Sequence, residues 1–88
     1  MLSEAENKCR VCGLDQGELI WGTDGHSPTH DICPCCGVEF GYEDCTTDGI
    51  AEHRKQWLAS GAEWSSKKER PSNWNLGAQL KLIPPKFL

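Results

Sequence analysis

The sequence is poor in aliphatic side chains and has no long apolar run. Leu, Ile, Val and Phe supply only 16 of the 88 residues, so the hydrophobic core is expected to be thin. The longest apolar runs, 19–21 and 82–83, fall far short of the roughly 20 residues that span a bilayer. We therefore predict one small domain, 1–88, with no membrane partner and with some further source of stability.

The N-terminal residues also lack the features of a signal peptide. Residues 1–8 contain no basic segment followed by an apolar stretch. The expected location is therefore the cytoplasm, where thiols stay reduced. In that compartment six cysteines in 88 residues are expected to bind metal instead of forming disulfides.

Most of the cysteines lie in two short motifs of the form C-x-x-C-G, at 9–13 and 33–37, with 20 residues between them. Two intervening residues let a tight turn direct both sulfurs at one metal ion, and the glycine lets that turn close. Two such motifs predict a closed tetrahedral site with one structural zinc ion. Iron, as in a rubredoxin-like electron carrier, is the alternative metal. The predicted ligands are Cys9, Cys12, Cys33 and Cys36.

The remaining cysteines and the histidines are not assigned to the metal. Cys35 fills an inner turn position and is expected to be a spare apolar side chain. Cys45 is expected to be a partly buried core thiol. The alternative interpretations are that it is an alternate metal ligand or a redox partner of Cys35. His26, His30 and His53 have no ligand partner at a suitable spacing. Apart from the isolated Cys45, nothing suggests a catalytic group, so we predict that the protein is not an enzyme.

The predicted fold is a small metal-stabilised α+β domain that begins with a rubredoxin-like zinc ribbon over 9–45. Residues 18–21 and 30–32 read as the two strands of a β-hairpin, because turn-forming residues separate them. Residues 38–42 alternate apolar with polar or small side chains. They predict a third strand that buries Val38, Phe40 and Tyr42.

A single α-helix is predicted within 46–62, over about 48–60, followed by a tryptophan-rich tail at 63–88 that packs on the ribbon. Capping residues precede the helix and Gly61 ends it. Its buried stripe is predicted to contain Ile50, Arg54, Trp57 and Leu58. In the tail, 70–75 reads as a turn and 79–83 as a strand. Trp64 and Trp74 are expected to supplement the core.

Charge divides the chain into two halves. Residues 1–45 carry a net charge of −7, whereas residues 46–88 carry +3. The acidic half is expected to attract a basic protein partner and to repel a nucleic-acid backbone. The candidate partner-binding acids are Asp31, Glu39, Glu43 and Asp44. The alternative is a nucleic-acid-binding strip, made of Lys67, Lys68, Arg70, Lys81 and Lys86 with the tail tryptophans.

The combined pattern resembles the small bacterial cysteine-rich CPCC-type proteins. The resemblance is carried by the two C-x-x-C-G motifs, the run 32–44, the R-x-x-W pair of Arg54 and Trp57, and the run 61–64. It implies a metal-binding ribbon without catalytic residues. Some proteins of this type look like immunity proteins encoded beside bacterial toxins. The resemblance therefore implies that this chain binds and neutralises a cognate toxin, for example a basic nuclease.

Overall fold

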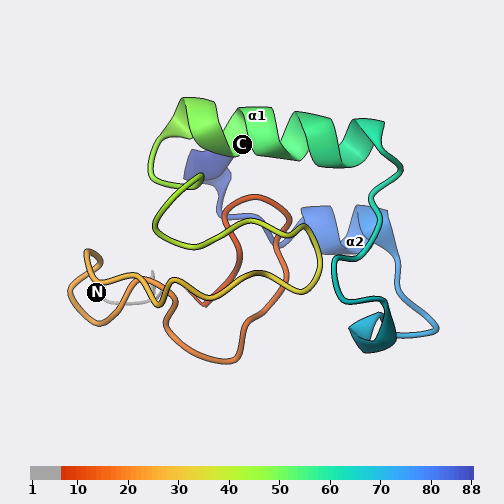
Figure 1. The fold of residues 1–88 in the computed structure, drawn as a ribbon, viewed down its shortest axis with the longest axis horizontal. Coiled ribbons are helices and arrows are strands. Elements are labelled where there is room, and N and C mark those ends of the chain that lie inside the picture. Colours follow the sequence, from red (N-terminus) through yellow and green to blue (C-terminus); the bar gives the residue numbers. More distant parts are fainter. Residues whose placement is uncertain (1–6) are drawn as a thin grey trace.

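The structure, a computed structural model, describes residues 7–88, and short helices are its only regular elements in that range. The two α-helices are α1 (Thr47–Ala59) and α2 (Leu76–Leu80), and the two 3-10 helices are η1 (Lys67–Glu69) and η2 (Pro85–Phe87) (Figure 1). Residues 7–88 form no β-strand, only isolated bridges between Lys8 and Asp15 and between Ile32 and Glu39. The prediction of an α+β zinc ribbon with a hairpin and a third strand is therefore wrong.

The expected hairpin between 18–21 and 30–32 is replaced by a bent loop. The carbonyl groups of Trp21 and Ile20 accept hydrogen bonds from the amides of Ser27 and Thr29, at 3.1 and 3.0 Å. Between those two donors lies Pro28, which has no amide hydrogen to extend a ladder. His30 then adopts a left-handed conformation, with φ of 65°. The chain turns before a second strand can form.

The expected third strand at 38–42 does not form either. Phe40 makes one backbone hydrogen bond, to the carbonyl of Asp31 at 3.0 Å. Gly41 then takes a φ of 94°, and its amide donates to the Asp44 carboxylate at 2.7 Å. Val38 and Phe40 are buried as predicted, whereas the Tyr42 side chain is 71% exposed and was wrongly placed in the core.

Helix α1 lies where the sequence predicted a helix. The Thr46 side chain caps its first turn by accepting a hydrogen bond from the Gly49 amide at 3.0 Å. Gly61, with φ of 102°, lets the chain leave the helix at its other end. The predicted buried stripe is correct at Ile50 and Trp57, but Leu58 is partly exposed to solvent.

The tail contains a helix where a strand was expected. Asn75 caps α2 by accepting a hydrogen bond from the Ala78 amide at 2.8 Å. The helical turn continues as the amides of Leu82 and Ile83 donate to the carbonyl groups of Gln79 and Leu80. The predicted strand 79–83 is therefore wrong, because the cap fixes a turn of helix upstream of an otherwise ambiguous apolar run.

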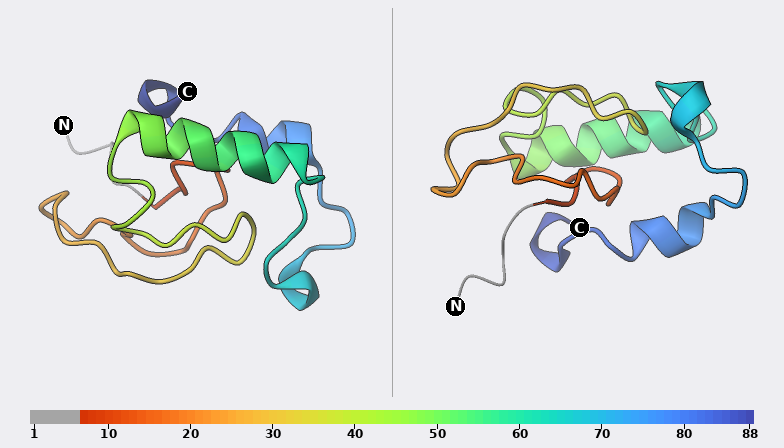
Figure 2. Two further views of the ribbon diagram at one scale, coloured as in Figure 1. Left: turned by 45° about the horizontal axis from the view of Figure 1, so that its top comes forward. Right: turned by 90° about the horizontal axis from the view of Figure 1, so that it is seen from below.

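The arrangement in space is layered. Seen from below, the N-terminal loop that carries the first cysteine motif lies between α1 and the tail that carries α2 and η2 (Figure 2). The core is one cluster of buried cysteines, aliphatic residues and tryptophans. Trp64 is buried and meets the half-buried Trp74 edge to face, with ring centres 5.6 Å apart. The expectation that the tail tryptophans supplement the core is confirmed.

Two expectations concern the N-terminus and membranes. The sequence predicts that 1–8 is not a signal peptide. Residues 1–6 of this segment lie outside the described residues. Two of the acids in the charge count, Glu4 and Glu6, also lie outside them. Within residues 7–88, no helix has both the length and the apolar character needed to cross a bilayer.

Candidate metal centre

The two cysteine motifs fold into the same backbone turn, which we call the first knuckle (9–14) and the second knuckle (33–38). In the first knuckle, the Cys9 amide donates to the Leu14 carbonyl and the Gly13 amide donates to the Cys9 carbonyl, each at 2.9 Å. The second knuckle repeats both bonds at the equivalent residues, at 2.9 and 3.0 Å. Both motif glycines have a positive φ, of 86° and 80°. The sequence repeat is therefore also a structural repeat.

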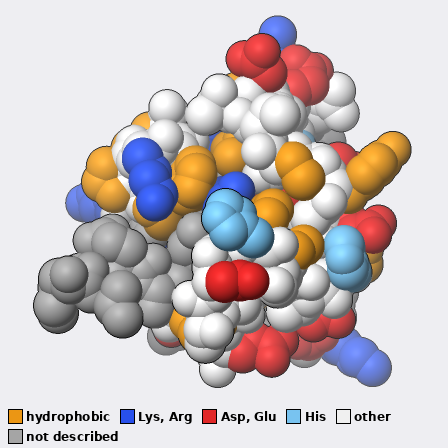
Figure 3. Space-filling view, turned by 90° about the vertical axis from the view of Figure 1, so that its left-hand side faces the viewer, with side chains coloured by type: hydrophobic (Ala, Val, Ile, Leu, Met, Phe, Trp, Pro, Cys, Tyr) orange, Lys and Arg blue, Asp and Glu red, His pale blue; other side chains and the backbone are white. Residues whose placement is uncertain are grey.

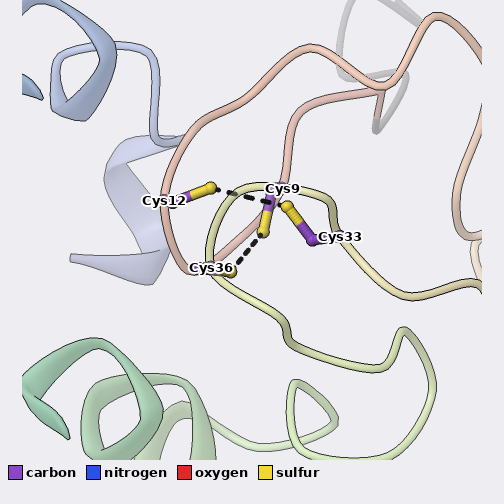
Figure 4. A group of neighbouring side chains, drawn as sticks. All are labelled: Cys9, Cys12, Cys33 and Cys36. Carbon is purple, nitrogen blue, oxygen red and sulfur yellow. Dashed lines mark hydrogen bonds between the residues drawn. The ribbon is translucent and has the colours of Figure 1, made fainter. Parts of the chain in front are cut away.

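The knuckles bring four sulfur atoms to one point between them (Figure 4). The Sγ atoms of Cys9 and Cys36 are 3.6 Å apart, those of Cys12 and Cys33 are 3.7 Å apart, and all four lie within 4.8 Å of one another. A tetrahedron with metal–sulfur bonds of about 2.3 Å has sulfur–sulfur edges of about 3.8 Å. The four buried thiols, which we call the four-cysteine cluster, thus form a donor set that could hold a tetrahedral metal ion.

The thiols of this cluster perturb one another's protonation. A hydrogen bond between Cys12 and Cys33 raises the pKa of Cys12 above its usual range and holds the pKa of Cys33 well below it. Four buried thiols this close cannot all ionise without a compensating positive charge. A bound dication supplies that charge, so metal binding would release protons and weaken at acid pH.

A buried glutamine, Gln79 of α2, ties the tail to the knuckles. Its side-chain Nε2 donates to the Cys12 carbonyl at 3.1 Å and to the Cys35 Sγ at 3.3 Å. Its Oε1 accepts a hydrogen bond from the Trp74 Nε1 at 2.7 Å. Sequence reasoning missed this residue, because an amide 67 positions from its partner carries no spacing signal. Gln16 donates directly to a sulfur of the cluster, with its Nε2 3.4 Å from the Cys33 Sγ.

Arg54 links three parts of the chain around the four-cysteine cluster. Its guanidinium donates to the carbonyl groups of Val11 (2.7 Å), Arg10 (2.8 Å) and Phe87 (2.7 Å). Burial lowers its pKa, while the charge of the nearby thiols Cys9, Cys12 and Cys36 opposes that shift. The sequence placed Arg54 on the inner stripe of α1, and its role there is to join α1 to the first knuckle and the C-terminal turn.

Replacing Arg54 by Lys is expected to weaken this junction. An ammonium cannot reach three carbonyl groups that diverge around a planar fork, and each lost bond to a charged donor costs about 1.5–3 kcal/mol. With at least one of the three bonds lost, we expect Arg54→Lys to lower the free energy of unfolding by at least about 1.5–3 kcal/mol, measured by urea denaturation. The exposed neighbour Lys55 provides the control: a Lys55→Arg variant as unstable as Arg54→Lys would contradict this role.

The other cysteines and the nearest histidine lie outside the set of four. Cys35 is fully buried, as expected for a spare apolar side chain, and faces Gln79. Cys45 is exposed, so its expected place as a partly buried core thiol is wrong. His53 is half-buried, with its Nε2 2.9 Å from the Cys36 carbonyl oxygen.

The four predicted partner-binding acids differ in their exposure to solvent. Asp31 is exposed, but Glu43 turns back to accept a hydrogen bond from the Glu39 amide at 2.9 Å. Asp44 is fully buried, and its carboxylate accepts hydrogen bonds from the Gly41 amide (2.7 Å) and the Trp21 Nε1 (3.3 Å). Burial raises the pKa of Asp44. Asp44 therefore stabilises the fold from inside. The prediction that it is a surface acid available to a partner is wrong.

One face of the molecule carries several separate acidic groups. On this face, shown in Figure 3, lysine, arginine and histidine side chains lie among them. The alternative nucleic-acid strip also loses its aromatic platform, because Trp64 is 4% exposed and the Arg70 guanidinium lies over the Trp74 ring at 5.2 Å. Rings packed in this way are not free to stack on bases.

Fold and site together define a small cysteine-rich protein with a cluster of four cysteines. No family model and no solved structure matches the chain. It is 37% identical to the uncharacterized protein YoaQ of Bacillus subtilis (strain 168), over 83% of this chain and 75% of that protein. It is 32% identical to the uncharacterized protein YozI of the same strain, over 83% and 74%. The chain belongs to the family that contains these two proteins.

Proposed function

We propose that this protein is a non-enzymatic protein-interaction module held together by one structural zinc ion. The observation that carries the proposal is the closure of the four-cysteine cluster: its side chains are between 0% and 7% exposed. Four thiolates complete a tetrahedron and leave no position for water or substrate, which is typical of structural and not catalytic zinc. Cys9, Cys12, Cys33 and Cys36 are the proposed ligands.

Zinc is preferred to iron because of what surrounds the cluster. The first knuckle lies between α1 and the tail (Figure 2), and Arg54 and Gln79 fasten it to both. A cluster enclosed in this way suits a redox-inert ion that stabilises the fold. An electron carrier instead needs its metal close to the surface that meets its redox partner.

The proposed role in binding follows from the lack of a catalytic arrangement among the described residues. The cluster is closed to substrates, and the exposed Cys45 makes no hydrogen bond to a basic side chain within residues 7–88. The resemblance to CPCC-type proteins makes a bacterial toxin, in particular a basic nuclease, the partner that we propose. Neutralisation by binding needs no catalytic group on this chain.

Cobalt substitution tests the closed tetrathiolate site. The protein is unfolded in acid with reductant, freed of metal, and refolded with one equivalent of Co²⁺. We expect the strong visible absorption of tetrahedral cobalt with sulfur-to-metal charge transfer, unchanged when imidazole is added, because no open position exists. A spectrum that shifts with added imidazole would show an open coordination site and contradict the proposal.

A further inference from the structure

A groove runs between the knuckles and the tail. One cavity of about 540 Å³ lies among residues 14–16, 31–34 and 64–71. A second, of about 360 Å³, shares Leu14, Asp15 and Pro71 with the first and continues toward α2. We call the two together the knuckle–tail groove. The first cavity alone is within the size range of sites that bind side chains or small ligands.

The wider end of this groove is acidic. Asp15, Asp31 and Glu69 line the first cavity, and no lysine, arginine or histidine does. Asp15 lies 3.9 Å from the Lys8 ammonium, in a pair that is open to solvent. Asp31 and Glu69 form no ion pair with any residue in 7–88. Among residues 7–88, Asp31 and Glu69 thus lie beside a cavity without an ion-pair partner.

The rest of the groove is apolar and open. Ile32, at the acidic end, is 52% exposed, and Leu82, in the second cavity, is 49% exposed. Trp64 lines the first cavity and Trp74 lines the second. The two tryptophans form walls of the groove, whereas Ile32 and Leu82 are large apolar side chains that stay exposed along it, which is typical of a protein-binding surface.

From this pattern we infer that the knuckle–tail groove binds an extended segment of a partner protein that carries an arginine or lysine followed by apolar residues. The cationic side chain would lie between Asp31 and Glu69, and the apolar side chains would cover Leu82. Charge complementarity selects this occupant, because the same carboxylates repel acidic peptides and nucleic acid. The inference rests on the proposed function as an interaction module and assigns its binding surface.

The test uses the zinc-loaded protein, labelled with ¹⁵N, and an acetylated probe peptide with one arginine followed by two leucines between glycines. We expect saturable NMR shifts at the amides of 14–16, 31–33 and 78–82. A peptide with glutamate in place of arginine, and one with serines in place of the leucines, should each bind at least about fivefold more weakly. Equal binding of all three peptides, or none at millimolar concentration, would overturn the inference.

Matched variants locate the binding. The pair Asp31→Asn with Glu69→Gln should weaken the probe by about five- to tenfold, and Ile32→Ser should do likewise. The control pair Glu18→Gln with Glu52→Gln removes two exposed acids outside the groove, and Tyr42→Ser removes an exposed apolar side chain. Losses as large in these controls would show attraction to the general surface and contradict the assignment.

Two further measurements distinguish a basic partner segment from self-association and from a general loss of the fold. If the same amides shift with protein concentration alone, and the groove variants abolish that effect, the occupant is a second copy of this chain and the inference falls. Zinc content is measured for each variant. A variant that keeps its zinc and loses the probe supports the groove assignment, whereas wild-type protein that retains zinc but binds no probe overturns the groove and leaves the metal centre intact.

Discussion

Cys9→Ser is expected to abolish metal binding and to unfold the region around both knuckles. Structural zinc contributes on the order of 10 kcal/mol to folding at neutral pH, and small domains have only about 5–15 kcal/mol of net stability. Cys9 is fully buried, with its Sγ 3.6 Å from that of Cys36. A serine hydroxyl there is a poor zinc ligand, and the thin core cannot replace the lost free energy. Circular dichroism and urea denaturation would measure the loss.

Two other cysteines serve as controls for this result. Cys45→Ser replaces an exposed thiol and should leave metal content and stability unchanged. Cys35→Ser should keep the metal, because Cys35 is not one of the four converging thiols. It should cost about 1 kcal/mol through a changed contact with Gln79. If Cys9→Ser were as stable as Cys45→Ser, the ligand assignment would be wrong.

Gly13→Ala is expected to have the second largest effect. Gly13 has a φ of 86°, which costs an L-residue about 1–2 kcal/mol. A Cβ there would also strike the Gln79 carbonyl oxygen and approach the Ile83 amide nitrogen to 3.0 Å. Both obstacles are backbone, so α2 must move away from the first knuckle, at a further cost of about 1–3 kcal/mol. Thermal unfolding of the zinc-loaded protein would measure the sum.

The second knuckle provides a matched control, because Gly37 occupies the equivalent position. Its φ is 80°, but a Cβ there would meet only the Ser65 side chain, at 3.6 Å. Gly37→Ala should therefore cost only the backbone strain of about 1–2 kcal/mol. Equal losses in the two variants would mean that contact between the first knuckle and α2 contributes nothing to stability.

Local patterns in the sequence predicted the helix and identified the cysteines that converge. A C-x-x-C-G unit determines its own turn, so two copies define the two knuckles whatever lies between them. Helix α1 likewise depends on its own cap at Thr46 and on a buried stripe that includes Ile50 and Trp57. Both features need only neighbours within a few positions, which is why sequence reasoning recognised them.

Features that depend on distant residues were missed or misread. The expected strands do not form, because Pro28, His30 and Gly41 interrupt the pairing of short apolar runs. Asp44 was counted as a surface acid because its partner, Trp21, lies 23 positions away in the chain. Gln79 meets the first knuckle only after the tail folds back. A single sequence carries no signal for such long-range contacts.

The most direct test of the proposed zinc site is the native mass of the wild-type protein, purified under reducing conditions and compared with Cys9→Ser. We predict that the wild-type chain carries one zinc ion in place of the protons of its metal-bound thiols, and that Cys9→Ser carries none. A folded wild-type protein without metal, or a red protein that carries iron, would contradict this zinc site.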